Sequence, residues 1–124
     1  MKCVNFLEEP RTYTNEEEFV GYLFDVEGEN ELFKKLSEVL QFPQYFGNNW
    51  NAVYDCLCDL HWITKKGIVP VHNQMPLVSD EILQIYLEVL FDAAKSWNND
   101  DEHYLKIVFA ERSRQHVEAK LIDL

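Results

Sequence analysis

The residues best suited to chemistry lie in the stretch 42–59, where amide and carboxylate side chains recur at helical spacing. Either Asn48 or Asn49 can cap the start of this predicted helix. Four polar residues recur at intervals of three or four and so share one helix face: Asn48, Asn51, Asp55 and Asp59. The apolar residues that recur in the same way on another face are Trp50, Val53, Leu57 and Leu60. One face can therefore enter a core while the other offers amides and carboxylates to a partner.

Catalysis is the alternative use of these groups, and their spacing does not favour it. Asp55 and Asp59 are i, i+4 neighbours that could carry out acid–base chemistry, but carboxylates at this spacing more often form a solvated helix face. Cys56 and His61 are five residues apart and would point in different directions from one helix. The histidines show no metal-ligand spacing, and the chain has no phosphate-binding glycine loop. We therefore expect no enzyme activity, no metal and no cofactor; a small hydrolase that uses Asp55 or a histidine with a metal is the remaining enzyme reading.

The charge of the chain restricts its partners. It has 22 acidic and 11 basic residues among 124, which gives a net charge of −11. Phosphate groups are bound by clustered Lys and Arg, so neither a nucleic acid nor an anionic membrane is expected as the ligand. A cationic protein is favoured instead, because opposite potentials accelerate association. The alternative is that the charge only keeps the protein soluble.

The three cysteines, Cys3, Cys56 and Cys58, form neither a disulfide pattern nor a C-x-x-C motif. They are expected to be reduced and to behave as small buried hydrophobes. The apolar run after Met1 is broken by two acidic residues and a proline, so it does not form a secretory signal, and no other stretch is long enough to span a membrane. We therefore expect a cytoplasmic protein.

Four segments are predicted as strands. Residues 2–7 and 18–26 would form an antiparallel pair, although residues 15–22 could instead begin a helix. Residues 67–71 contain a proline, which predicts an edge strand or a strand with a break. In residues 104–110 the side chains alternate, so that at least one face of the strand is buried.

Helices are predicted between these strands. Asn30 is the expected N-cap of the first, the second occupies about residues 48–60, and Ser79 caps the third. The core face of the third helix is expected to be Ile82, Ile85, Tyr86, Val89, Leu90 and Ala93. The tail from Arg112 to Leu124 is expected to form a final helix. Because helices between strands favour parallel pairing, the predicted fold class is α/β, a single domain over residues 1–124 with helices packed on a small sheet.

A resemblance to a known family covers the stretch from Leu40 to Leu57, which is similar to the signature of the barstar family, intracellular inhibitors of barnase-type ribonucleases. The residues in common are Phe42, Pro43, Tyr45, Phe46, Gly47, Asn49, Ala52, Tyr54, Asp55, Cys56 and Leu57. The resemblance implies a three-stranded parallel sheet packed by helices over about residues 20–111. The N-terminal segment would then add an extra strand or hairpin, and the C-terminal tail would be a further addition.

Carried over by position, the resemblance implies a toxin-binding surface that consists of Tyr45, Asn49, Asn51, Tyr54, Asp55 and Asp92, to which the polar helix face adds Asp59. Asp55 would occupy a phosphate-binding pocket of the nuclease, and Tyr45 would be an aromatic contact. Tyr54 stands where the family usually has tryptophan, which keeps a stacking surface. Asn51 stands where the family's second acid is usually found, so one charge pair would be lost. Asp92 is the nearest candidate for an acid from the last helix of the family's fold.

The function implied by the resemblance is that of a bacterial immunity protein, which neutralises a basic ribonuclease toxin in a one-to-one complex. The toxin would be the cell's own secreted nuclease or one delivered by a competitor, as in contact-dependent inhibition. The chain itself is expected to be a monomer or a weak dimer. The alternative is an immunity or regulatory protein that binds a non-barnase toxin away from its active site. That alternative predicts tight binding that survives changes at Asp55 and Tyr45 and fails after changes in residues 8–24.

Overall fold

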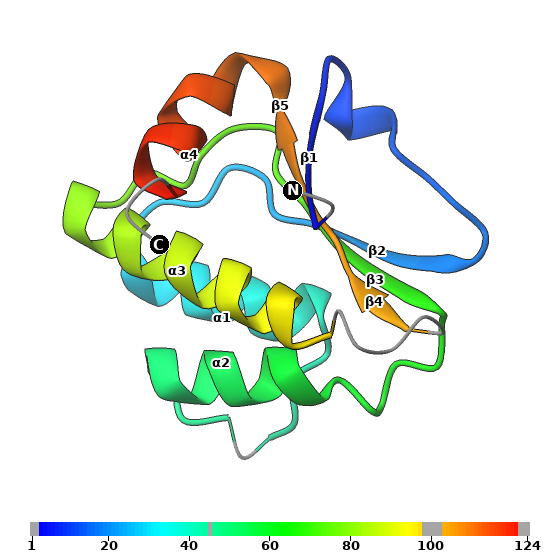
Figure 1. Ribbon diagram of the computed structural model, residues 1–124. Helices are drawn as coiled ribbons and strands as arrows, with labels where there is room; N and C mark the ends of the chain where they lie inside the picture. Colours follow the sequence, from blue (N-terminus) through cyan, green and yellow to red (C-terminus); the bar gives the residue numbers. More distant parts are fainter. Residues whose placement is uncertain (1–2, 45, 98–102, 122–124) are drawn as a thin grey trace.

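The structure is a computed structural model, and it describes residues 3–44, 46–97 and 103–121 (Figure 1). Its strands are β1 (Val4–Leu7), β2 (Glu18–Tyr22), β3 (Gly67–Val71), β4 (Tyr104–Leu105) and β5 (Ile107–Ala110). Its helices are α1 (Glu29–Val39), α2 (Trp50–Asp59), α3 (Asp80–Ser96) and α4 (Arg114–Leu121), with short 3-10 turns η1 (Pro10–Thr12) and η2 (Glu111–Ser113). The prediction of an α/β fold is confirmed, and the predicted final helix corresponds to η2 and α4.

The strands form one parallel sheet in the order β1-β5-β3-β2, with β4 beside the start of β3. The extra N-terminal strand is present, since Val4 lies opposite Ile107 and Leu7 opposite Ala110. The predicted antiparallel pair is wrong, because β1 and β2 lie at opposite ends of the strand order and the segment between them crosses the sheet instead of turning back. The alternative helix over residues 15–22 is wrong as well, because that segment leads into β2.

The position of β3 corrects a second expectation. Its proline predicted an edge strand, but β3 lies inside the sheet, between β2 and β5, and is buried along its length. Along β2 the pairing is continuous, with Pro70 opposite Gly21. On the other side β3 pairs with β4 at Ile68 and then with β5 at Val71, so Pro70 falls where that pairing is interrupted. A proline is tolerated there because no strand partner requires its missing N–H.

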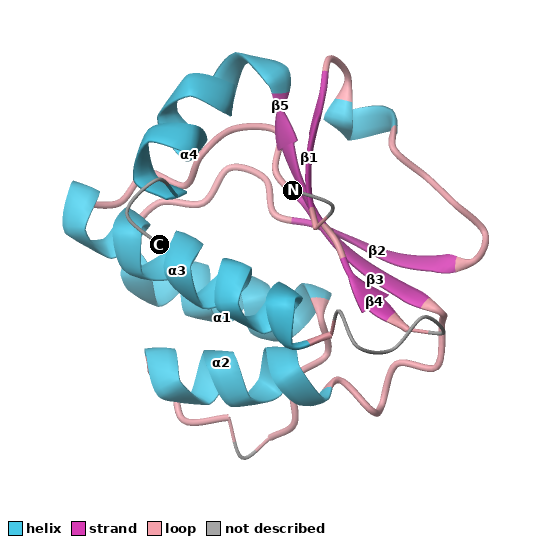
Figure 2. Ribbon diagram, in the orientation of Figure 1, coloured by secondary structure: helices cyan, strands magenta, loops and turns pink. Residues whose placement is uncertain are grey.

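The helices lie on one side of the sheet, and the segment 8–17 lies on the other (Figure 2). The main core fills the space between the helices and the sheet and includes Leu32, Leu36, Leu57, Leu90 and Phe109, each at most 2% exposed. A smaller cluster on the opposite face consists of Val69, Val71 and Val108, covered by half-buried side chains that include Tyr13 of the crossing segment. The N-terminal segment therefore covers sheet surface that no helix reaches.

The core face of α3 differs from the predicted one. The buried residues are Leu83, Tyr86, Leu87, Leu90, Phe91, Ala93 and Ala94. Ile82, Ile85 and Val89, which were expected in the core, are only half-buried. The helix carries apolar residues around most of its circumference, so periodicity alone does not determine which stripe faces inward. The packing of α3 against α2, the sheet and α4 makes that choice.

The start of α1 is also shifted from its predicted cap. The helix begins at Glu29, and its N-cap is Gly28, not Asn30. Gly28 has a φ of 89°, a conformation that glycine adopts at little cost. Its backbone N–H donates to the Leu77 carbonyl at 2.9 Å, and its carbonyl accepts from Leu32 at 3.0 Å. The cap is thus determined by a contact with a distant loop, which the local sequence does not reveal.

A buried polar cluster connects the N-terminal segment to the sheet. Glu18 is only 6% exposed, and its carboxylate accepts hydrogen bonds from the hydroxyls of Tyr13 and Tyr104. The Lys106 ammonium lies 3.3 Å from Oε2 of Glu18 and donates to the Tyr13 hydroxyl at 2.6 Å. The Tyr104 ring lies over Gly67, where a Cβ atom would overlap it. These contacts hold the crossing segment, β2 and β4 together.

Candidate functional site

The helix α2 begins where Asn49 caps it. The Asn49 Oδ1 accepts a hydrogen bond from the backbone N–H of Ala52 at 2.8 Å, and its Nδ2 donates to the Gly47 carbonyl at 3.2 Å. Asn48 has a φ of 51°, in the left-handed region that asparagine tolerates better than most residues. Of the two predicted caps, Asn49 is therefore correct, and Asn48 lies in the approach to the helix rather than on it.

The inner face of α2 is anchored in the core. The predicted apolar face is confirmed, with Trp50 half-buried and the remaining residues buried: Val53, Leu57 and Leu60. The Trp50 indole N–H donates to Oε2 of Glu29 on α1 at 2.8 Å. Its ring centroid lies 4.7 Å from that of Phe33 and 5.8 Å from that of Tyr86. Because α1 and α3 both hold α2, the outer face of α2 is preorganised. No local pattern predicted the Glu29 contact, since 21 positions separate the two residues.

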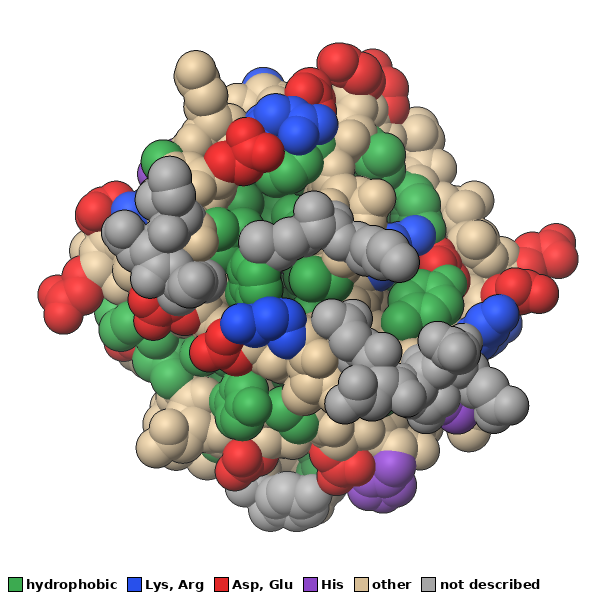
Figure 3. All heavy atoms as spheres, viewed as in Figure 1, with side chains coloured by type: hydrophobic (Ala, Val, Ile, Leu, Met, Phe, Trp, Pro, Cys, Tyr) green, Lys and Arg blue, Asp and Glu red, His purple; other side chains and the backbone are tan. Residues whose placement is uncertain are grey.

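The outer face of α2 presents amide, phenol and carboxylate groups. Asn51, Tyr54, Asp55 and Asp59 are all exposed, so the predicted common face is confirmed for the residues that lie on α2. Tyr54 is one of two large hydrophobic residues that are strongly exposed in the described chain, at 37%. Acidic side chains gather along the lower edge of the molecule, beside α2 (Figure 3). We refer to Asn51, Tyr54, Asp55 and Asp59 as the α2 face.

The carboxylates near this face differ in their partners. Asp59 lies 2.8 Å from Nδ1 of His61, and Asp92 on α3 lies 3.5 Å from the ammonium of Lys95. Asp55 forms no ion pair or hydrogen bond through its carboxylate with any residue in the described part of the chain. Its charge therefore remains available to a ligand.

The end of α3 lies beside the α2 face. The hydroxyl of Ser96 donates to Sγ of Cys58 at 3.5 Å, which joins the two helices. The neighbouring Cys58 raises the pKa of the Tyr54 hydroxyl most, and the carboxylates of Asp92 and Asp55 raise it further. Tyr54 is thus within electrostatic range of both acids. The structure therefore places Asp92 within reach of this face; its part in binding a toxin stays a prediction.

The histidine and cysteine side chains that could carry out other chemistry include several that are buried in the core. His72 is buried, its Nδ1–H donates to the Val108 carbonyl at 3.0 Å, and its Nε2 accepts from the Tyr86 hydroxyl at 2.6 Å. Burial lowers the pKa of His72 to about 4, so it is a neutral core histidine at pH 7. Cys3 and Cys56 are buried free thiols, as predicted, whereas Cys58 is only half-buried. Among the described residues, no group of three or more His, Cys, Asp or Glu side chains lies close enough to hold a metal ion.

Two further expectations concern Tyr45 and membrane-spanning segments. Tyr45, the predicted aromatic contact, lies outside the described residues. In the part of the chain that the structure describes, no helix has the length and apolar character needed to cross a membrane.

Comparison with known proteins assigns most of this fold to one family. The family model of barstar, described as barnase inhibitor, matches residues 19–110. This range contains β2 except its first residue, Glu18, together with β3 to β5 and α1 to α3, and therefore the whole α2 face. It leaves out β1, η1, η2 and α4. No curated protein matches the chain.

Proposed function

Because this chain belongs to the barstar family, we propose that it is an immunity protein that blocks the active site of a basic, barnase-type ribonuclease. The α2 face would enter the active-site cleft, and the complex would contain one copy of each protein. The inhibitor would act inside the cell, against the cell's own secreted nuclease or one delivered by a competitor. The family is one of inhibitors, so no catalytic residue is assigned to this chain.

The observation that carries the proposal is the free carboxylate of Asp55 on a helix anchored in the core. A ribonuclease cleft is cationic because it binds phosphate, and a carboxylate can take the place of a phosphate if each charge is paired on burial. Among the described residues Asp55 has no cationic partner that it would leave on binding, and the contact of Trp50 with Glu29 already holds α2 in place. The net charge of −11 accelerates the encounter with a basic enzyme.

The other residues of the predicted surface would act around Asp55. Tyr54 would stack on an apolar or planar group of the enzyme, since its ring is exposed beside the acid. Asn51, one turn earlier, would contribute hydrogen bonds without a charge. Asp59 and Asp92 carry partners of their own, and they would add mainly to the negative potential. Asn49 would act by positioning the helix, and Tyr45 would be an aromatic contact.

The proposal is tested by adding the purified protein to barnase and measuring RNA cleavage. Equimolar protein should abolish cleavage, and Asp55→Ala should weaken binding by at least about 2 kcal/mol, or about thirtyfold, as expected for a central charged anchor. Glu16→Ala is the matched control, because it removes the same charge from an exposed residue outside the family match. Unchanged cleavage, or an effect of Asp55→Ala below about 1 kcal/mol, would contradict the proposal. A loss of binding confined to Glu16→Ala would favour binding away from the active site.

A further inference from the structure

The helix α2 is held against its neighbours by a directional contact near each end. Near its N-terminus, the indole N–H of Trp50 donates to the carboxylate of Glu29 on α1 at 2.8 Å. Near its C-terminus, the indole N–H of Trp97, the C-cap of α3, donates to the Leu57 carbonyl at 2.9 Å. The helix α2 has ten residues, and helices of that length are marginal in water on their own. Its place in the molecule is therefore determined by contacts with α1 and α3.

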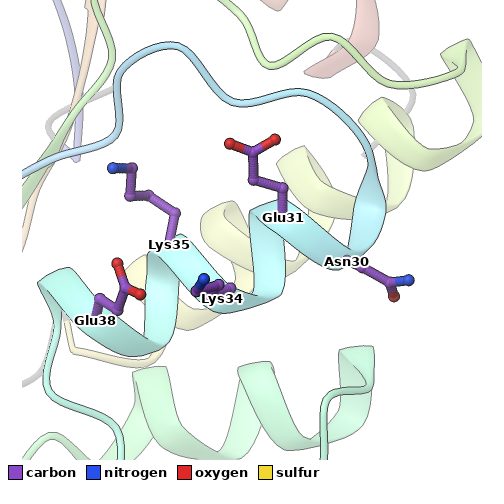
Figure 4. A pocket seen from close by; sticks show the side chains of 5 residues that line it. All are labelled: Asn30, Glu31, Lys34, Lys35 and Glu38. Carbon is purple, nitrogen blue, oxygen red and sulfur yellow. The ribbon is translucent and has the colours of Figure 1, made fainter.

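The two contacts meet α2 at different distances from Asp55. The contact from α1 ends at the first residue of α2, ahead of the α2 face. Other charged side chains of α1, Glu31 and Lys35 among them, line a hollow and point away from α2 (Figure 4). The contact from α3 instead ends at Leu57, two residues after Asp55. Of the two, it is the contact closer to the proposed anchor along the helix.

The bond from Trp97 also satisfies a carbonyl at the end of α2. Carbonyls in the last turn of a helix lack some or all of their N–H partners within the helix, and Leu57 lies in the last turn of α2. The hydroxyl of Ser96, which precedes Trp97, lies 3.5 Å from Sγ of Cys58, which follows Leu57. Two consecutive residues at the end of α3 thus contact two consecutive residues of α2. Together they restrict both the position and the rotation of this turn.

We propose that Trp97 is a positioning residue for inhibition, which holds Asp55 where its carboxylate enters the phosphate-binding site of the ribonuclease. The proposal rests on the proposed function, since it concerns the same α2 face. A binding group has to be held within about 0.5 Å of its productive position. Apolar contacts alone tolerate shifts and repacking, whereas a hydrogen bond depends steeply on distance and angle. In this role Trp97 acts through Asp55 and does not itself touch the enzyme.

The test compares Trp97→Phe with Trp62→Phe by measuring the kinetics of binding to barnase. Trp62 is a matched control, because it is also half-buried against the core and its indole N–H donates to a backbone carbonyl, that of Leu40, at the same 2.9 Å. That bond ends at the C-cap of α1 and not on α2. Phe keeps most of the packed ring, and both variants keep the net charge of −11. Each variant leaves one carbonyl without its donor, so both should lower the urea midpoint by similar amounts.

We expect Trp97→Phe to weaken binding at least about tenfold and Trp62→Phe to weaken it less than about threefold. The loss should appear in the dissociation rate, because neither variant changes the charge that governs association. A fold that is merely less stable would instead lower the fraction of active protein and leave the dissociation rate unchanged. Adding Trp97→Phe to Asp55→Ala should weaken binding by less than about threefold, because the residue that Trp97 positions is already absent.

The outcomes separate this proposal from the proposed function. If Asp55→Ala weakens binding but Trp97→Phe and Trp62→Phe change the dissociation rate alike, Trp97 does not position the α2 face and only this proposal is overturned. The same holds if the losses from Trp97→Phe and Asp55→Ala multiply in the double variant, since Trp97 would then act independently of Asp55. If the unaltered protein does not bind barnase, or if Asp55→Ala has no effect, the proposed function fails and this inference fails with it.

Discussion

Replacing Glu18 with Gln should destabilise the protein by about 3 kcal/mol, because the carboxylate is the centre of the buried polar cluster. It accepts hydrogen bonds from Tyr13 and Tyr104 and lies beside the Lys106 ammonium. A hydrogen bond to a charged group contributes about 1.5–3 kcal/mol. Gln keeps one acceptor oxygen, but its NH₂ group cannot accept, and a neutral amide leaves Lys106 with a weaker partner. The loss of one to two charge-assisted bonds gives the expected value.

Urea unfolding at pH 7, followed by circular dichroism, measures this loss. Glu17→Gln is the control, because Glu17 is the adjacent residue, carries the same charge and is exposed. It should change the free energy of unfolding by less than about 0.5 kcal/mol, as most surface substitutions do. A loss for Glu18→Gln no greater than that for Glu17→Gln would refute the role of the cluster.

The pH dependence of the free energy of unfolding is an independent test of the role of the Glu18 charge. Burial alone would raise the pKa of Glu18, but the hydrogen bonds from Tyr104 and Tyr13 and the charge of Lys106 outweigh it, so the pKa is lowered from the usual 4.5. Since the folded pKa is the lower one, the ionised carboxylate stabilises the fold above the unfolded value. This stabilisation is lost as the pH falls through the folded pKa. The difference in free energy of unfolding between wild type and Glu18→Gln should therefore be constant near neutral pH and shrink well below pH 4.5. If this difference stayed constant below pH 4.5 as well, the charge of Glu18 would not be the source of the stabilisation.

Two further substitutions test local packing and capping. Gly67→Ala should destabilise the protein by about 1–3 kcal/mol in urea unfolding, because the added methyl group overlaps the Tyr104 ring, and an unchanged midpoint would show that the ring moves freely. Asn49→Ala should cost about 1 kcal/mol, because the Ala52 N–H loses its cap. Asn51→Ala removes the same amide from an exposed position on the same helix, so an equal loss in both variants would contradict a capping role for Asn49.

Local signals in the sequence predicted the parts of this fold that local contacts determine. Asn49 and Ser79 cap α2 and α3 with their own side chains, each bonding a backbone N–H three residues on. The two faces of α2 follow from helical periodicity, and the structure confirms both. The α/β class followed from the order of the elements, and the structure confirms it.

Long-range contacts determine the parts that the sequence did not predict. The proline of β3 suggested an edge strand because its missing N–H is costly, but the interruption between β4 and β5 removes that cost. Gly28 caps α1 through a bond to Leu77, which lies 49 positions away in the chain. The sequence also did not reveal that Asp55 lacks an ion-pair partner among the described residues, since it shows an acid but not which cations reach it.

The carboxylates of Asp55 and Asp59 destabilise the helix α2 itself. The helix has no acid in its first turn and no base in its last turn. Asp59 lies in the last turn, where the helix dipole disfavours negative charge, and Asp55 lies one turn before it. A neutral residue at Asp59 would stabilise the helix by a few tenths of a kcal/mol to about 1 kcal/mol. Asp55 and Asp59 are i, i+4 neighbours of like charge, and their repulsion costs about 0.2–0.5 kcal/mol more. Asp59 recovers part of this cost through His61, but Asp55 has no such partner in the described chain. Since Asp55 has no ion-pair partner among the described residues, it could form a charge pair in a complex without breaking one, and the proposed function therefore assigns the central role to Asp55 rather than to Asp59 or Asp92.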